Sequence, residues 1–469
     1  MENKTNKKRF AALCSMVVMV TLAIIVIGIY QTGVIKGINP IADEKRDALI
    51  VEQCMNNSVE GIFYDRKGTA LTQAGEVGEN ATLNYPTEYS YIIGSKNSNG
   101  TRSGLRQSFG DYLYDIGTGH DGIGADITLT IDNGLQTFAT ALLKGHVGSI
   151  NVIDADTGEI LCLASRGDGE VDYNVNEYSK NYSTQSLIKD FFMNRSILAS
   201  HPPGSTIKVL TTIAIIENNI EDTYVIENPY YSPSGKPITN GFKTYKCGKD
   251  ANNQEALSES INTYFATRAV LAGSKTMQEI AERFFIGDSI ELDFTTLTSN
   301  YDVSGEDPIY ELASTWYGQG KTQISPLHLT MIMGSIINEN RDMPKAHLIS
   351  KIENEGEVVY EGKSEILRKE VISASTKSKL VEFLENTAVE EYELIKKNKR
   401  HKCTIIAKTG TCEIENKERN HLYLVAGYSY GGKNYAISID WAREPRGSIA
   451  RSLYETGRKL IAYLESAKP

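Results

Sequence analysis

The sequence is short of cysteine, histidine and net positive charge. Its 469 residues include six cysteines, none in a C-x-x-C arrangement, and seven scattered histidines, so no metal site is indicated. Cys403 and Cys412 are not expected to pair, because one extended strand would hold them roughly 30 Å apart. The net charge of -10 argues against a nucleic-acid partner, since phosphate binding requires a basic surface.

Long apolar runs are also rare, and residues 11–30 form the one that stands out. Twenty uncharged residues in a helix span roughly 30 Å, the thickness of a bilayer core. Four cations, Lys4, Lys7, Lys8 and Arg9, come just before this run, whereas residues 31–43 hold only Lys36. This asymmetry predicts a single anchor with a cytoplasmic tail (1–10) and the remainder outside the cell. A cleaved signal peptide is the alternative, but the run is longer than such segments and no small-x-small site follows.

The remaining pattern predicts an α+β fold. Residues 31–124 are polar and rich in turn residues, with short strands expected at 61–64 and 89–93, which suggests a small, mostly extended domain. Beyond residue 125, a helix at 135–143, a mainly helical middle and a C-terminal helix at about 449–464 are expected. Strands are predicted at 127–131, 149–154, 160–164, 403–407, 422–426 and 435–439. Short turns, such as Asp156-Thr157-Gly158 and Gly431-Gly432, favour antiparallel order.

A serine and a lysine follow a Pro-Pro-Gly turn at the start of an apolar helix. Ser205 and Lys208 are spaced S-x-x-K, which places them one helical turn apart on the same face. A serine becomes a nucleophile when a nearby base removes its proton, and a lysine can be that base if burial or a second cation keeps it neutral. Taken alone, Ser205 reads as an N-cap. A second S-x-x-K, beginning at Ser186, lacks the turn and the apolar helix and is interpreted as surface.

Two further short motifs follow in the chain. Ser260 and Asn262 form an S-x-N before an apolar helical run, where a helix cap is the simpler interpretation. Lys408-Thr409-Gly410-Thr411 ends a predicted strand, and any isolated K-T-G is more often a strand turn than a site. Here Gly410 would permit close approach of a substrate backbone, while the two threonines and Lys408 would offer donors to an anion.

In this order the three motifs resemble those of the serine acyltransferases of the penicillin-binding and β-lactamase superfamily. Further likeness, over roughly residues 60–466, is to class B penicillin-binding proteins; it is carried by residues 60–66, 85–86, 126–132, 156–161, 194–195, 317–320 and 325–327. The resemblance implies a transpeptidase domain (125–469) with a five-stranded antiparallel sheet flanked by helices, plus an all-helical subdomain. One transmembrane helix (11–30) and a linker with a small mostly-β pedestal (31–124) would precede it. The pedestal is short for this class, and Ile261 adds no polar group to S-x-N.

The resemblance also implies a reaction and the residues that perform it. Ser205 would attack a peptidoglycan stem peptide after Lys208 takes its proton, with Ser260 relaying the proton and Lys408 supplying positive potential. Asn262, Thr409, Gly410 and Thr411 would bind the substrate, and no cofactor or metal is implied. β-Lactams would acylate Ser205, and a membrane glycosyltransferase of the wall machinery is an expected partner.

Other functions remain open at this stage. The same three motifs occur in class D-like β-lactamases, which have little need of an anchor and a pedestal, and water in place of an amine would give a D,D-carboxypeptidase. A non-catalytic sensor of β-lactams or wall fragments is a third reading. It is disfavoured because only ten residues precede the predicted anchor, too few for a signalling domain.

Overall fold

The computed structural model describes most of the chain beyond the predicted anchor. The described ranges are 53–54, 56–95, 102–115, 122–167, 193–240, 247–414, 418–445 and 451–466. The predicted anchor at 11–30 and Ser186 lie outside them. Within these ranges, no helix combines the length and the apolar character that a membrane crossing needs.

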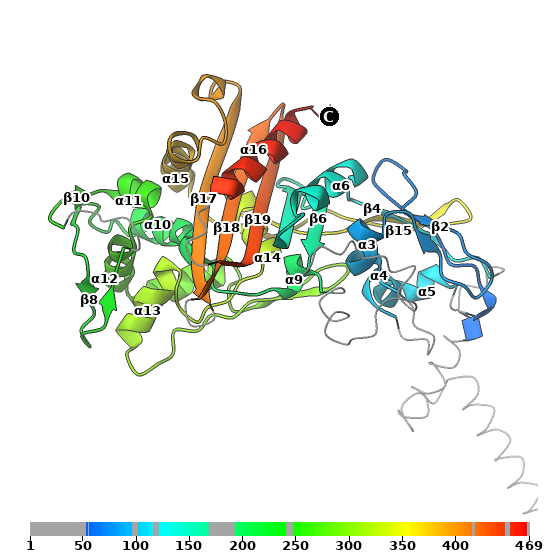
Figure 1. Cartoon of the computed structure of the whole chain (residues 1–469), viewed down its shortest axis with the longest axis horizontal. Helices are drawn as coiled ribbons and strands as arrows, with labels where there is room; N and C mark the ends of the chain where they lie inside the picture. Colours follow the sequence, from blue (N-terminus) through cyan, green and yellow to red (C-terminus); the bar gives the residue numbers. More distant parts are fainter. Residues whose placement is uncertain are drawn as a thin grey trace, which may run out of the picture.

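A five-stranded antiparallel sheet forms the centre of the molecule (Figure 1). Its order joins three late strands to two early ones: β17 (Cys403–Ile414), β18 (Arg419–Tyr430), β19 (Lys433–Pro445), β5 (Val147–Asp154) and β6 (Ile160–Arg166). The predicted strands and their antiparallel order are confirmed, although the three late strands are longer than expected. Turn glycines Gly431 and Gly432, both with positive φ, join β18 to β19. β17 is an edge strand, so one side of its backbone is open to other partners.

Helices cover both faces of this sheet. The amphipathic helices α6 (Asn133–Leu142) and α16 (Arg451–Ser466) pack on one face. The almost wholly buried α14 (Pro326–Ile337) packs on the other, with the short α9 (Arg195–Leu198) beside it. The helices α6 and α16 were predicted from the spacing of their apolar residues. With α14 and α9 on the opposite face of the sheet, the core has three layers.

A mainly helical region lies beside the edge strand β17 (Figure 1). Its helices are α10 (Lys208–Glu217), α11 (Asn253–Glu259), α12 (Asn262–Arg283), α13 (Pro308–Tyr317) and α15 (Ala374–Asn386), followed by the π-helical turn η3 (Thr387–Glu391). The prediction of an all-helical subdomain is wrong in detail. Three two-stranded ladders interrupt it: β7 (Tyr224–Val225) with β10 (Asp250–Ala251), β8 (Tyr230–Tyr231) with β9 (Pro237–Ile238), and β11 (Ser289–Glu291) with β12 (Thr296–Thr298).

The N-terminal region shares a second sheet with later parts of the chain. The order is β1 (Phe63–Tyr64), β4 (Asp126–Leu129), β14 (Ile349–Asn354) and β15 (Glu357–Glu361), with β1 parallel to β4. Smaller ladders join β2 (Thr72–Gln73) to β3 (Thr82–Leu83) and β13 (Met343–Lys345) to β16 (Glu365–Arg368). The pedestal region is therefore hydrogen-bonded to strands from beyond residue 125, although the predicted domain boundary itself stays a prediction.

The predicted mostly-β character of the pedestal region is wrong for its described residues. They form α3 (Pro86–Ile93), α4 (Gly104–Ser108) and α5 (Gly110–Leu113), and each of their strands has only two residues. The strand expected at 89–93 lies inside α3. Pro86 at the first helical turn favours a helix start, and burial of Tyr89, Ile92 and Ile93 outweighs the β propensity of tyrosine and isoleucine.

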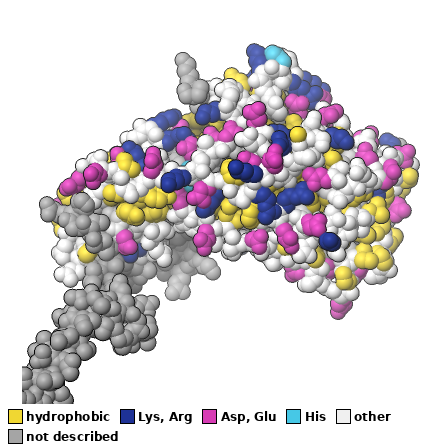
Figure 2. Space-filling view, turned by 180° about the vertical axis from the view of Figure 1, so that it is seen from behind, with side chains coloured by type: hydrophobic (Ala, Val, Ile, Leu, Met, Phe, Trp, Pro, Cys, Tyr) yellow, Lys and Arg dark blue, Asp and Glu magenta, His cyan; other side chains and the backbone are white. Residues whose placement is uncertain are grey.

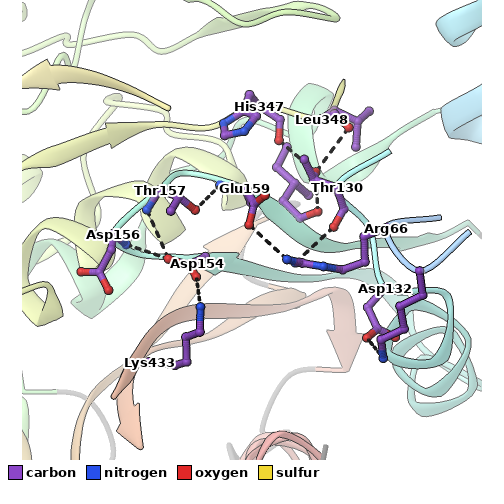
Figure 3. Close-up of polar contacts among 12 residues, drawn as sticks. Arg66, Thr130, Asp132, Asp154, Asp156, Thr157, Glu159, His347, Leu348 and Lys433 are labelled. Atoms are coloured by element: carbon purple, nitrogen blue, oxygen red, sulfur yellow. Dashed lines mark hydrogen bonds and ion pairs between the residues drawn. The ribbon is translucent and has the colours of Figure 1, made fainter. Parts of the chain in front are cut away.

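A polar junction ties this region to the first hairpin of the central sheet (Figure 3). Arg66 donates to the backbone carbonyl of Thr130 at 3.4 Å and to the carboxylate of Glu159 at 3.2 Å. The Asp156-Thr157-Gly158 turn is capped by Asp154, which accepts from two turn amides at 3.0 and 3.2 Å. On the face seen from behind, acidic and basic side chains are interspersed (Figure 2), in keeping with a solvated surface.

Candidate active site

Ser205 lies in a turn that leads directly into a buried helix. The turn is the 3₁₀ segment η2 (Gly204–Ile207), and α10 starts at Lys208, so the predicted helix start is confirmed with a tighter first turn. Ser205 is half-buried, whereas Lys208 is completely buried. Thr206 secures the turn by donating its hydroxyl to the carbonyl of Pro203 at 2.7 Å.

Two glycines allow the Ser205 turn to touch the K-T-G strand. Gly204 has a φ of +57°, and a Cβ there would lie 2.7 Å from the amide nitrogen of Thr411. A Cβ on Gly410 would lie 2.7 Å from the carbonyl oxygen of Pro203 and 3.2 Å from the Ser205 nitrogen. Contacts this short exclude any side chain. The amides of Ser205 and Thr411 therefore lie on two backbone segments that are in direct contact.

The S-x-N motif lies at the junction of two helices, facing Lys208. Ser260 ends α11 with a left-handed φ of 57°, and α12 begins at Asn262. This turn directs both oxygens of Ser260 at the lysine: Lys208 Nζ lies 2.9 Å from the carbonyl oxygen and 3.1 Å from Oγ. Asn262 Oδ1 accepts from the same Nζ at 2.6 Å. Ser260 and Asn262 are thus not simple helix caps, since both are bonded to the amine.

Burial disfavours a positive charge on Lys208. Desolvation lowers the pKa of its amine well below the ordinary value of 10.5, and the nearby cation of Lys408 lowers it further. The ring of Phe265 lies 5.5 Å from Nζ and contributes an apolar wall. A neutral amine has two N–H donors and one lone pair, which suits two carbonyl-type acceptors and a hydroxyl. The chemistry expected of a general base is therefore available at Lys208.

The lysine amine is directed at the S-x-N motif and not at Ser205. Within the described ranges, no hydrogen bond joins Ser205 Oγ to Lys208 Nζ, because all of the contacts of that nitrogen run to Ser260 and Asn262. A change in the serine rotamer or in the position of the amine is needed before a proton can pass between them. Hydrogen bonds of this kind are commonly loose without substrate.

The K-T-G residues occupy the middle of β17. Lys408 is fully buried and its Nζ lies 3.2 Å from the hydroxyl of Tyr392. Thr409 is half-buried and contacts the same hydroxyl, through its backbone N–H at 3.2 Å and its Oγ1 at 3.0 Å. Thr411 is exposed. The structure therefore brings together all eight residues that the sequence selected, from three distant segments.

Two contacting residues were not selected as site residues from the sequence. Tyr392 is one tyrosine of 26, in a charged segment, and nothing in its local pattern indicates contact with K-T-G. Gln319 donates its side-chain amide to the carbonyl of Thr411 at 3.1 Å. It belongs to the segment 317–320 that carried part of the resemblance, so a signal for it was present in the sequence.

No metal centre is found in the described part of the chain, where no three ligand-type side chains converge. His201 forms an isolated bridge with Ile324 just before the Ser205 turn. Its ring packs against that of His421 with a centroid distance of 3.9 Å and a tilt of 34° between the planes. Burial first, and the neighbouring His421 second, lower the pKa of His201 to about 4. A neutral, packed imidazole is consistent with a structural role.

The fold of the chain is that of D,D-transpeptidase domains. Over 88% of this chain and 100% of the other, it superposes on the D,D-transpeptidase domain of a peptidoglycan glycosyltransferase from Eggerthella lenta with a TM-score of 0.73 at 21% identity. A superposition on PBPA from Mycobacterium tuberculosis covers 87% of this chain and 100% of the other, with a TM-score of 0.74 at 18% identity. At these identities the likeness establishes the fold alone.

Sequence comparison identifies the family. Residues 148–455 match the family described as the penicillin binding protein transpeptidase domain, and the chain belongs to that family. It is 25% identical to penicillin-binding protein 3 of Bacillus subtilis over 327 residues, covering 67% of this chain and 47% of the relative. It is 22% identical to the peptidoglycan D,D-transpeptidase PbpA of Mycolicibacterium smegmatis over 376 residues, or 76% and 72% of the two chains. The predicted resemblance to class B penicillin-binding proteins is thereby confirmed, although the chain spans less than half the length of the Bacillus relative.

Proposed function

We propose that this protein is a peptidoglycan D,D-transpeptidase that works through a serine acyl-enzyme and is acylated by β-lactams. The observation that carries the proposal is the close approach of the segments that carry Ser205, Lys208, Ser260 and Lys408. The family match, and relatives named as D,D-transpeptidases, support the same reaction class.

In the proposed first step, neutral Lys208 accepts the proton of Ser205, and Ser205 Oγ attacks the carbonyl of the penultimate D-alanine of a stem peptide. The amides of Ser205 and Thr411 stabilise the oxyanion. Ser260, 3.1 Å from Lys208 Nζ, passes the proton to the departing D-alanine amine. The bond to D-alanine breaks as the serine ester forms, so the acyl group is retained and the leaving amine is protonated.

Binding is assigned to the residues that flank these groups. Asn262 holds an amide of the substrate, and Lys408 supplies positive potential. Thr409 and Thr411 bind the terminal carboxylate, and Gly410, which has no side chain, lets the Ser205 turn lie directly against β17. An amine of a neighbouring stem peptide then resolves the ester and completes the cross-link.

Two alternatives share this site. Water as acceptor would make the protein a D,D-carboxypeptidase or, with penicillin, a class D-like β-lactamase. A non-catalytic sensor is a weaker alternative. The buried amine of Lys208 contacts both residues of the S-x-N motif, and burying an amine costs free energy that binding alone does not require. We further propose that residues 11–30 anchor the chain to the membrane, with the catalytic region outside the cell and a membrane glycosyltransferase as partner.

The proposal is tested by labelling with a fluorescent penicillin. Ser205→Ala should abolish the labelled band, since the attacking hydroxyl is absent. Ser186→Ala, in the second S-x-x-K of the chain, should label like the unaltered protein and is the matched control. Labelling that persists in Ser205→Ala would remove Ser205 from the role of nucleophile.

A further inference from the structure

The open side of β17 is partly occupied by two side chains. The Thr409 N–H is donated to Tyr392 and therefore points away from β18, the strand paired with β17 in the described part of the chain. Because backbone direction alternates with a period of two, the N–H and C=O of Thr411 point to the same open side. The carbonyl of Thr411 accepts from Gln319 at 3.1 Å. A short stretch between Tyr392 and Gln319 is left for a substrate backbone.

Tyr392 is held rigidly in this position. It directly follows the π-helical turn η3, and its side chain is only 4% exposed. Its ring stacks on that of Tyr454 from α16, with centroids 4.8 Å apart and 18° between the planes. Arg458, one turn further along α16, donates to the carbonyl of Tyr392 at 3.3 Å. The hydroxyl is therefore fixed by the packing of α16 and not by its polar contacts alone.

Three donors converge on the hydroxyl oxygen of Tyr392. They are Lys408 Nζ at 3.2 Å, the Thr409 N–H at 3.2 Å and Thr409 Oγ1 at 3.0 Å. The phenol oxygen accepts at most two of these bonds, but its own proton can be donated to Thr409 Oγ1, so all three contacts can be made at once. Lys408 Nζ also donates to the carbonyl oxygen of Thr409 at 3.3 Å. Tyr392 therefore holds a cation and a hydroxyl side by side, a pair of groups that suits a carboxylate.

The spacing fits a short substrate end. Thr409 and Thr411 are two residues apart on a strand, roughly 7 Å. If the scissile carbonyl lies at the Thr411 amide, one amino-acid residue and its terminal carboxylate fill the distance to Thr409. A substrate chain that continued beyond that residue would meet the ring and hydroxyl of Tyr392. This hydroxyl already accepts the next N–H on the edge of β17, that of Thr409.

We infer that Tyr392 closes the carboxylate end of the substrate groove, and that it is a positioning and specificity residue for substrates with a free terminal carboxylate. It orients Lys408 and Thr409 for that carboxylate and blocks chains that extend past it. This inference rests on the proposed function, since it presumes that Ser205 is acylated from this groove.

The test compares two thioesters of N-benzoyl-D-alanine, one with mercaptoacetic acid and one with its methyl ester. Tyr392→Phe keeps the ring stack and removes only the hydroxyl. We expect kcat/KM for the acid to fall about tenfold, mainly through KM, as for loss of a hydrogen bond that supports a charged group. The kcat/KM for the methyl ester should change less than twofold. The ratio of kcat/KM for the acid to that for the ester should therefore fall. The control is Tyr428→Phe, which loses a partly buried hydrogen bond of 2.9 Å from its hydroxyl to Glu465. This variant should preserve both values.

Two results would overturn the inference about Tyr392: an acid value within twofold of the unaltered protein, or a fall of acid and ester in equal proportion. The second would show a structural role alone. Failure of the proposed function itself is recognised separately, because Ser205→Ala would then retain thioester turnover or the unaltered protein would show none.

Discussion

Lys208 Nζ lies 2.6 Å from Asn262 Oδ1, the shortest of the three contacts that fix this amine. The partner is a neutral, half-buried amide, whose Nδ2 donates to the carbonyl of Thr239 at 2.8 Å. An amide orients the lysine without stabilising its positive charge as an anion would. The choice of asparagine therefore preserves the neutral form of Lys208 that proton transfer requires.

Asn262→Asp should reverse this effect. A carboxylate at 2.6 Å favours the ammonium form, so the pKa of Lys208 rises and the base is protonated over a wider pH range. The acid limb of the β-lactam acylation rate should move to higher pH, with a loss of about tenfold at neutral pH for each unit of pKa shift. Stopped-flow acylation between pH 5 and 10 measures this. Asn240→Asp, whose Oδ1 accepts from the Thr263 N–H at 2.9 Å, is the control and should shift the profile far less. Identical profiles for Asn262→Asp and the unaltered protein would contradict the assigned base.

Gly410→Ala should separate the Ser205 turn from β17. The new methyl group would lie 2.7 Å from the carbonyl of Pro203, and backbone cannot yield as a flexible side chain can. Displacement by even 1 Å costs about 100-fold in reactions that depend on geometry, so acylation should fall by that order. Gly334→Ala in α14 meets its nearest atoms at an ordinary 3.5 Å and should react normally. Near-normal acylation by a folded Gly410→Ala protein would refute the proposed contact.

How much of this was readable from the sequence depends on the range of the interactions. The strands of the central sheet and the helices α6 and α16 follow from local periodicity. The eight site residues were selected through the resemblance of three motifs to those of a known superfamily. Tyr392 was not found because its role arises from packing against α16, more than sixty residues later. The strand expected at 89–93 failed for the same reason, since burial against distant residues decided the local structure.

Arg106→Met should strongly destabilise the N-terminal region. Arg106 and Glu60 form a buried ion pair at 2.6 Å, and the guanidinium also donates to the carbonyls of Gly94 and Ala81, both at 2.6 Å. Removing one partner leaves Glu60 as a buried, unpaired charge, which costs about 3–5 kcal/mol. The loss of unfolding free energy is measured by urea unfolding of the N-terminal region, monitored by limited proteolysis. The double variant Glu60→Leu/Arg106→Met should lose less than Arg106→Met alone, and a greater loss in the double variant would contradict this.

Stability should fall in mild acid through His328. This residue is fully buried in α14, with Nε2 2.8 Å from the carbonyl of Phe284, and desolvation lowers the pKa of its imidazole to about 4. The unfolded chain, with a histidine pKa of about 6.5, binds the proton more readily. The stabilisation is therefore complete above pH 6.5 and is lost as the pH falls towards 4, by on the order of 3 kcal/mol.

Unfolding free energies measured in urea between pH 7 and 4 check this. His328→Asn should reduce stability at pH 7 but flatten the slope below pH 6.5. His401→Asn, at an exposed position, should retain the original slope and serves as the control. An undiminished slope in His328→Asn would assign the acid sensitivity to other groups.

The most direct test of the account is peptide mass spectrometry after reaction with penicillin, combined with the lifetime of the adduct. We predict one adduct of intact penicillin mass on the peptide that contains Ser205, with a half-life long compared with its formation. An adduct on any other residue, or rapid release of hydrolysed penicillin, would contradict the proposed transpeptidase site.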